Sequence, residues 1–106
     1  MSAKRVIPRK RATRDVEEII DHYVAEDAAR AALRFVAALK RAYRFIARRP
    51  GAGSPRYAHE FGIPELRAWK IARFPYVVFY VEGDTHLDVW RVLHEHRDIP
   101  PTLRDE

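Results

Sequence analysis

The sequence predicts an α+β domain in which an antiparallel two-helix hairpin packs on an antiparallel sheet of three to four strands. Three observations support this fold class. The first half carries two apolar stripes at helical spacing, and the second half alternates short apolar runs with turn residues. Between them, residues 51–65 hold three of the four glycines and two prolines, which indicates a long surface loop. Helices on one face of an antiparallel sheet would bury both stripes.

The first helix is expected to begin after Thr13, a suitable N-cap residue, with Asp15 and two glutamates in its first turn, where they complement the helix dipole. Its apolar residues recur every three to four positions and form one stripe, consisting of Val16, Ile19, Ile20, Tyr23 and Val24.

Asp27 is the expected cap of the second helix, which should run from Ala28 to Arg49 before Pro50 and Gly51 end it. Its stripe consists of Ala32, Phe35, Val36, Leu39, Ala42, Tyr43 and Ile46. We interpret both stripes as core, because a helix that covers a sheet needs such a face.

Three consecutive antiparallel strands are expected over residues 66–71, 76–81 and 86–93, with a tight turn at residues 82–85. The middle run, YVVFYV, is rich in β-branched and aromatic residues and is expected to be buried. Residues 6–8 could add a short edge strand, where Pro8 is tolerated. The helices leave one sheet face without cover, and that face is the expected place for a partner to bind.

The 106 residues are expected to form one domain with flexible tails at residues 1–5 and 99–106. Without cysteine, the chain has no disulfide framework and no thiolate chemistry, which fits a reducing cytoplasm. It has no apolar segment of signal-peptide or membrane-spanning type, so no membrane association is expected.

Charge is arranged in blocks within a net charge of +5. Residues 1–14 carry six basic groups and no acids, residues 15–27 carry six acids and no Lys or Arg, and residues 28–49 carry seven basic groups and no acids. Such blocks favour an acidic partner, either nucleic acid or a polypeptide. The alternative is a solvated basic face that keeps the protein soluble.

The densest cluster of functional groups follows the last strand. His94 and His96 point to the same side of a strand and, with Arg97, could perform acid–base chemistry of a ribonuclease type, assisted by Arg73 or Arg91. The alternative is that these arginines form structural ion pairs, Arg97 with Asp98 among them. No metal site is expected, because the spacing specifies too few ligands. No nucleotide cofactor is expected either, because no phosphate-binding loop is present.

Trp69 and Trp90 could stack on nucleic-acid bases, but on apolar strands tryptophan more often packs in the core. Both interpretations stay open at this point.

The order of these elements resembles the ParE branch of the ParE/RelE toxin superfamily over residues 6–98. The residues that carry the resemblance are Asp15-Val16-Glu17-Glu18-Ile19, Arg49-Pro50-Gly51-Ala52-Gly53, the run from Tyr76 to Tyr80, and Arg91-Val92-Leu93-His94 with Arg97-Asp98.

The resemblance implies a toxin that inhibits DNA gyrase without being an enzyme and without a cofactor. It also implies neutralisation by a ParD-like antitoxin with an acidic C-terminal segment, in a hetero-oligomer that reaches DNA only through the antitoxin. The alternative is a RelE-type, ribosome-dependent mRNA endoribonuclease with His94, His96 and Arg97 as catalytic residues. The central-strand arginine of RelE-like nucleases falls near Val77 here, and no tyrosine follows Tyr80 to match their C-terminal catalytic tyrosine.

Residues for two contact surfaces follow from this interpretation. Basic side chains that border the sheet face and the helix groove suit an acidic segment that folds as it binds. The expected antitoxin-binding residues are Arg67, Lys70, Arg73, Tyr76 and Arg91. The expected target-binding residues are Trp69, His94, His96 and Arg97.

Overall fold

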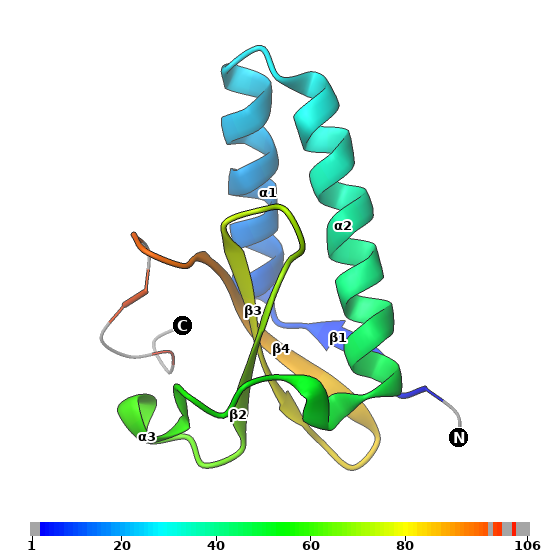
Figure 1. Ribbon diagram of the computed structural model, residues 1–106, viewed down its shortest axis with the longest axis vertical. Coiled ribbons are helices and arrows are strands. Elements are labelled where there is room, and N and C mark those ends of the chain that lie inside the picture. The colour runs from blue at the N-terminus through cyan, green and yellow to red at the C-terminus, as the bar shows by residue number, and fades with distance from the viewer. Residues whose placement is uncertain (1–2, 98, 101–102, 104–106) are drawn as a thin grey trace.

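A computed structural model describes residues 3–97, 99–100 and 103 of the chain. Two long helices form a hairpin that rises from a four-stranded sheet (Figure 1). The elements are β1 (Arg5–Pro8), α1 (Lys10–Ala25), α2 (Ala29–Arg48), a 3-10 turn η1 (Pro50–Ala52), α3 (Ala58–Phe61), β2 (Leu66–Lys70), β3 (Tyr76–Glu82) and β4 (His86–His94). The predicted α+β class and helix hairpin are confirmed, and each of the three consecutive strands lies within one residue of its predicted limits.

The strands lie in the order β1-β4-β3-β2. The predicted meander is present, because β2 pairs with β3 and β3 with β4, both antiparallel. The edge strand β1, however, pairs with β4 in parallel, so the sheet is mixed rather than wholly antiparallel. Parallel neighbours require a crossover connection, and the helix hairpin with the strands that follow it supplies that connection here.

α1 begins earlier than predicted, α2 begins within one residue of its predicted start, and neither predicted N-cap residue acts as a cap. α1 starts at Lys10, three residues before Thr13, and its N-cap Arg9 makes no side-chain cap hydrogen bond. Asp27 does not cap α2. It adopts a left-handed backbone conformation, with φ of 57°, in the turn between the helices, and the N-cap is Ala28. Packing of the apolar faces, more than capping, therefore sets the helix limits.

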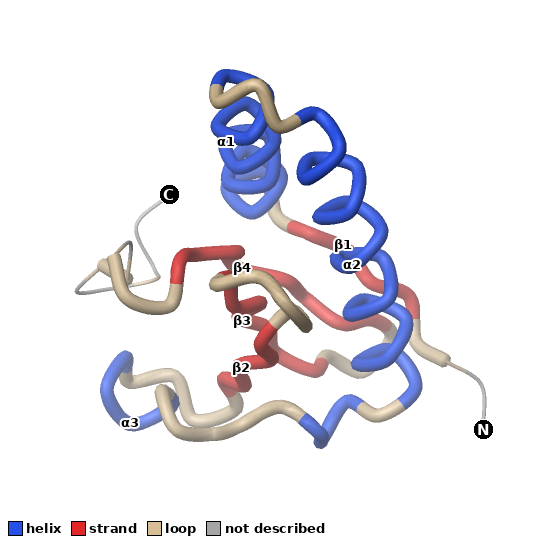
Figure 2. The backbone as a smooth tube through the Cα atoms, turned by 45° about the horizontal axis from the view of Figure 1, so that its top comes forward, coloured by secondary structure: helices blue, strands red, loops and turns tan. Residues whose placement is uncertain are grey.

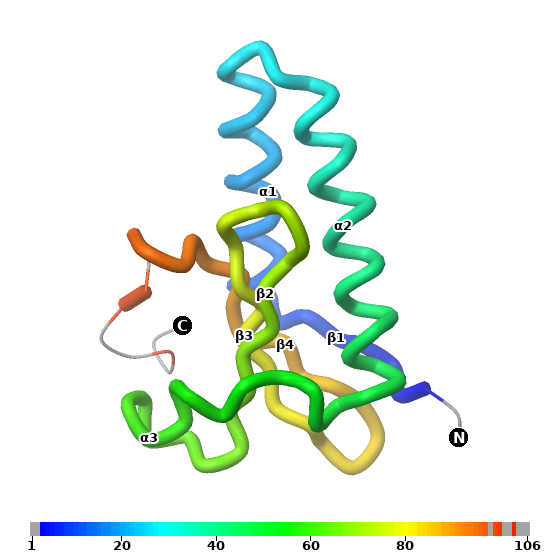
Figure 3. Tube along the Cα trace, in the orientation of Figure 1, coloured from blue at the N-terminus to red at the C-terminus, as the bar shows by residue number. Residues whose placement is uncertain are grey.

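One apolar core lies between the helix hairpin and the sheet (Figure 2). The tip of the β2–β3 hairpin closes the upper end of this core, where Phe74 contacts the rings of Tyr23 and Phe35 edge-on at 6.0 and 5.6 Å. The trace in Figure 3 shows that hairpin rising beside the helices. The predicted stripes supply most of the buried helix residues, namely Ile19, Phe35, Leu39, Ala42 and Ile46, and Ala12 and Ala38 add to them. Val24, predicted to belong to the buried stripe of α1, is instead 56% exposed.

A second apolar core lies on the opposite face of the sheet, and it corrects the prediction that this face is uncovered. Two chain segments cover this face. One is the 57–63 segment, which contains α3 and precedes β2 in the sequence, and the other follows β4 and contributes Ile99 and Leu103. Its buried members are Phe61, Ile63, Leu66, Ala68, Val77, Phe79, Trp90, Leu93 and Leu103. The segment 51–65, predicted to be a surface loop, thus acts in part as the cover of a core. These described residues therefore occupy the sheet face that was expected to be open to a partner.

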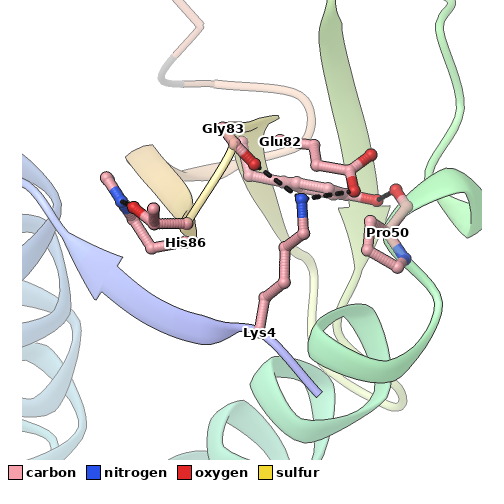
Figure 4. Close-up of polar contacts among 7 residues, drawn as sticks. Lys4, Pro50, Glu82, Gly83 and His86 are labelled. Carbon is pink, nitrogen blue, oxygen red and sulfur yellow. Dashed lines mark hydrogen bonds and ion pairs between the residues drawn. The ribbon is translucent and has the colours of Figure 1, made fainter. Parts of the chain in front are cut away.

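The turn after α2 is fixed to the sheet by buried and half-buried hydrogen bonds. The Tyr80 hydroxyl donates to the Pro50 carbonyl at 2.6 Å and accepts from the Gly53 amide at 3.0 Å. Nearby, Lys4 Nζ lies 2.9 Å from the Glu82 carboxylate and donates to the Gly83 carbonyl at 2.6 Å (Figure 4). These contacts hold the C-terminal end of α2 against β3, and thereby fix the position of α2 over the sheet.

Candidate partner-binding surfaces

A groove between α2 and β2 exposes aromatic surface next to cations. Phe45 of α2 stacks on Trp69 of β2, with ring centroids 4.6 Å apart and planes inclined by 20°. Phe45 remains 38% exposed, which is unusual for an aromatic residue that has an apolar core available beside it. The pair borders a cavity of about 240 Å³, which is also lined by Ala38, Arg41, Ala42, Lys70 and Ala72. We call this feature the α2/β2 groove.

Positive charge surrounds the α2/β2 groove on both sides. Arg41 on α2 and Lys70 on β2 are exposed and line it, and no acidic residue in the described part of the chain does. Lys70 also donates to the Phe74 carbonyl at 2.9 Å, which keeps its ammonium near the hairpin tip. Arg73, exposed at that tip, adopts a left-handed backbone conformation with φ of 70°, which is rare for a residue other than glycine, Asn or Asp.

Three other residues predicted to bind an antitoxin lie elsewhere. Arg67 is half-buried and donates to the Gly53 carbonyl at 2.7 Å. Tyr76 is 5% exposed and packs edge-on against Phe35. Arg91, 7% exposed, does not border any open sheet face, because its guanidinium is buried beneath α1. Of the five, only Lys70 and Arg73 present an exposed cation near the groove.

Arg91 forms a buried, two-pronged ion pair with Asp15 of α1. Its Nε donates to Asp15 Oδ2 at 2.7 Å and its Nη2 to Oδ1 at 2.9 Å, and the Val92 amide donates to Oδ2 at 3.1 Å. A bulge in β4 accompanies this contact, since Tyr80 pairs with Val89 but Phe79 pairs with Arg91. Bulges redirect side chains in this way. The pair joins α1 to β4.

A polar cavity of about 400 Å³ adjoins this ion pair. It brings Tyr76, Arg91 and Arg97 together from three places in the sequence, beside Arg11, Glu18 and His22 of α1. His94 lies next to it, with its ring edge-on to Tyr76 at 5.5 Å. His96 is exposed, and its ring lies 6.1 Å from that of His94. Asp98, the expected partner of Arg97, lies outside the described residues.

His94 makes a hydrogen bond with the segment that follows β4. Its Nδ1 accepts the backbone N–H of His96 at 3.1 Å, which places the ring proton on Nε2. In this tautomer Nδ1 is engaged by the backbone and Nε2–H is left as a donor. Arg91, which was expected to assist acid–base chemistry, forms an ion pair with Asp15 instead. Within residues 3–97, 99–100 and 103, no group of three or more metal-ligating side chains occurs.

Trp90 packs rather than stacks on a partner. It is buried in the second core, its indole N–H donates to Asp88 at 3.0 Å, and the Arg9 guanidinium lies over its ring at 3.8 Å. Trp69 is half-buried and belongs to the α2/β2 groove, not to the region of His94 and His96.

A family model for the ParE toxin of the type II toxin-antitoxin system parDE matches residues 6–99. The chain belongs to this ParE toxin family. A solved structure described as the chromosomal ParDE TA system from P. aeruginosa shares the fold, with a TM-score of 0.71 and 20% identity over 87% of this chain and 96% of that one. No curated protein sequence matches the chain. The match to ParE means that the RelE-type alternative is not favoured.

Two residues of this ParE-family chain escaped the sequence analysis. Asp15 was assigned to the helix dipole, yet it lies four positions before Ile19 and so falls within the apolar stripe. A carboxylate there signals a buried cation partner. Phe45 was passed over because it lies outside the apolar stripe of α2. An aromatic residue on the polar side of a helix was the available signal for the groove.

No helix in the described part of the chain is both long enough and apolar enough to cross a membrane.

Proposed function

We propose that this chain is a toxin that inhibits DNA gyrase by binding to it, and that a ParD-like antitoxin with an acidic segment neutralises it. Membership of the ParE toxin family supports the role as a toxin that acts on gyrase. The observation that supports neutralisation by an acidic antitoxin segment is the Phe45–Trp69 stack between Arg41 and Lys70, because it combines an apolar anchor with positive charge. Aromatic anchors in partly desolvated grooves supply most of the energy of many interfaces.

The α2/β2 groove suits one face of an amphipathic acidic segment. Apolar side chains of the segment would contact Phe45 and Trp69, and its carboxylates would meet the cations on either side. Such a segment gains its order only on binding, so part of the interaction energy offsets its lost entropy. Strand addition to β2 is restricted there, because Ala68 already exchanges two backbone hydrogen bonds with Ser54, at 2.8 and 2.9 Å. A side-chain groove is therefore the better site.

The target-binding surface is proposed to include His96 and Arg97, which follow β4. Both are exposed, and neither lines the α2/β2 groove. His94 is half-buried and positions this segment through the hydrogen bond from the His96 amide. Antitoxin and target would thus contact different parts of the molecule.

A supercoiling assay tests this function. Purified protein added to gyrase and relaxed plasmid should inhibit supercoiling or trap cleaved DNA. The variant carrying His96→Ala and Arg97→Ala should inhibit less, whereas Lys10→Ala, on the exposed side of α1, should inhibit as the wild type does.

Absence of inhibition at micromolar excess of a folded protein would contradict the proposal. Translation-dependent mRNA cleavage that is lost on His94→Ala or His96→Ala would instead support the RelE-type alternative.

A further inference from the structure

The solvent-facing side of α2 is cationic along its whole length. Six exposed basic residues lie on it, and the sequence from Ala29 to Arg48 contains no acidic residue. At 100° per residue these six fall within one sector opposite the buried stripe of the helix. We call them the α2 ridge: Arg30, Arg34, Lys40, Arg41, Arg44 and Arg48.

This arrangement works against helix stability in the isolated protein. Like charges four residues apart repel, and three such pairs occur here: Arg30 with Arg34, Lys40 with Arg44, and Arg44 with Arg48. Each pair destabilises a helix by roughly 0.2–0.5 kcal/mol. A solvated helix face more commonly mixes charges of both signs, which gives stabilising pairs instead.

The acidic neighbour α1 does not neutralise the ridge. α1 carries the exposed acids Glu17, Glu18 and Asp21. In the described part of the chain, none of the six ridge cations forms an ion pair with α1 or with any other residue. Three ridge residues, Lys40, Arg44 and Arg48, also border a cavity of about 470 Å³ between α2 and β1, and none of the described residues that line this cavity is acidic. The ridge is therefore available to an external anion.

The shape of the ridge indicates which anion it fits. α2 is 20 residues long, so its cations extend over about 30 Å on a straight helix that rises beyond the sheet (Figure 1). An acidic polypeptide would need apolar anchors along that length. Among the described residues of α2, the large apolar side chains that are exposed are Leu33, near Arg30 and Arg34, and Phe45, which faces the α2/β2 groove and stacks on Trp69. Double-stranded DNA needs no apolar anchors, because its phosphates present regularly spaced negative charges along a rod-shaped molecule.

We propose that the α2 ridge binds the phosphate backbone of double-stranded DNA directly, without base specificity. This differs from the expectation that DNA is reached only through an antitoxin. The inference does not rest on gyrase as the target, and the test uses DNA alone.

The experiment is a fluorescence anisotropy titration of a labelled duplex of mixed sequence with the full-length protein at several salt concentrations. Six phosphate contacts predict a log–log slope of affinity against salt of about −5, or a loss of about 10³-fold between about 50 and about 200 mM salt. The variant Lys40→Gln/Arg44→Gln/Arg48→Gln should bind with a slope of about −2.7. These substitutions leave the α2/β2 groove intact and should keep or raise thermal stability, because they remove repulsion.

A matched control distinguishes an effect of the α2 ridge on DNA binding from an effect of the protein's net charge. Lys10→Gln/Arg14→Gln/Arg56→Gln removes three exposed cations from α1 and the loop after η1, and should keep the wild-type slope. An equal fall of the slope in both variants would overturn the proposal, as would absence of duplex binding at about 50 mM salt, where such contacts are strong. Displacement of DNA by polyglutamate at equal charge concentration would also overturn it, because the ridge would then select an acidic polypeptide.

Discussion

Asp15 and Arg91 lie 76 residues apart in the sequence and form a two-pronged ion pair, with both side chains at most 8% exposed. The pair joins the start of α1 to β4, and Asp15 also accepts the Val92 amide. Both carboxylate oxygens of Asp15 therefore accept hydrogen bonds, and Nε and Nη2 of Arg91 donate to them. Such a pair fixes one arrangement of helix on sheet, since either charge alone would be buried without compensation.

Removal of one member of this pair should destabilise the fold strongly. Arg91→Ala is expected to lower the free energy of unfolding by about 3–5 kcal/mol, because the Asp15 charge stays buried without its partner. The double variant Asp15→Leu/Arg91→Met should recover part of the loss, since apolar residues of similar size can replace a buried pair. Urea unfolding followed by circular dichroism measures both. A double variant as unstable as Arg91→Ala would show that the Val92 hydrogen bond dominates.

Gly53 should tolerate no side chain, although Gly51 close by should. A Cβ at Gly53 would lie 2.5 Å from the Tyr80 hydroxyl and 3.0 Å from Arg67 Cβ, whereas one at Gly51 would meet nothing within 4 Å. Gly53→Ala should therefore destabilise by about 1–3 kcal/mol, the usual cost of overpacking. Gly51→Ala is the matched control and should change stability by less than about 0.5 kcal/mol. Equal thermal melting of both variants would contradict the described contact.

Alkaline pH should destabilise the protein in part through Tyr43. Burial raises the pKa of Tyr43 from its ordinary value of 10.0 to about 12, and the negative charge of Asp15 acts in the same direction. Below pH 10 both states keep this proton. Between pH 10 and 12 the unfolded chain releases it while the folded chain retains it, so stability falls as pH rises. By pH 12 the wild type should lose about 2–3 kcal/mol of its free energy of unfolding through this group, and the variant Tyr43→Phe should not show that loss. Identical pH profiles of unfolding would contradict this role.

Arg73→Gly should separate stability from binding. The left-handed conformation of Arg73, with φ of 70°, costs an ordinary residue about 1–2 kcal/mol and glycine much less. The substitution is expected to keep or raise the melting temperature. Antitoxin affinity should nevertheless fall, because an exposed cation near the α2/β2 groove is lost. Asp27→Gly, at the other left-handed residue, is the control, and it should leave antitoxin affinity unchanged. Unchanged affinity in Arg73→Gly would remove Arg73 from the binding surface.

Local patterns in the sequence predicted most of the elements, and long-range contacts decided the rest. The β3–β4 hairpin followed from the residues at its turn, and the helix stripes followed from their spacing. The parallel pairing of β1 with β4 did not, because it joins residues about 80 positions apart, such as Arg5 and His86. The cover of the second sheet face was missed for a similar reason: Phe61 and Leu103 lie in segments without a regular apolar period.

In the candidate site, too, local sequence patterns predicted some residues and long-range contacts decided the others. Lys70 and Arg73 were predicted as part of a partner surface because they are basic residues beside apolar strands, and both are exposed. Arg91 shares that local pattern but is buried, because Asp15 of α1 pairs with it, and Tyr76 is buried against Phe35 of α2. The groove itself could not be predicted, because it depends on Phe45 and Trp69 meeting across two elements.

The most direct test of the account is relief of gyrase inhibition by the antitoxin, measured with the wild type and with a groove variant, Trp69→Ala/Lys70→Glu. The account predicts that the antitoxin restores supercoiling in the presence of the wild-type toxin. The folded groove variant should still inhibit gyrase, and far more antitoxin should be needed to restore supercoiling. Relief of both proteins at the same antitoxin concentration would contradict the α2/β2 groove as the site of neutralisation. A wild-type protein that leaves gyrase fully active would contradict the proposed target.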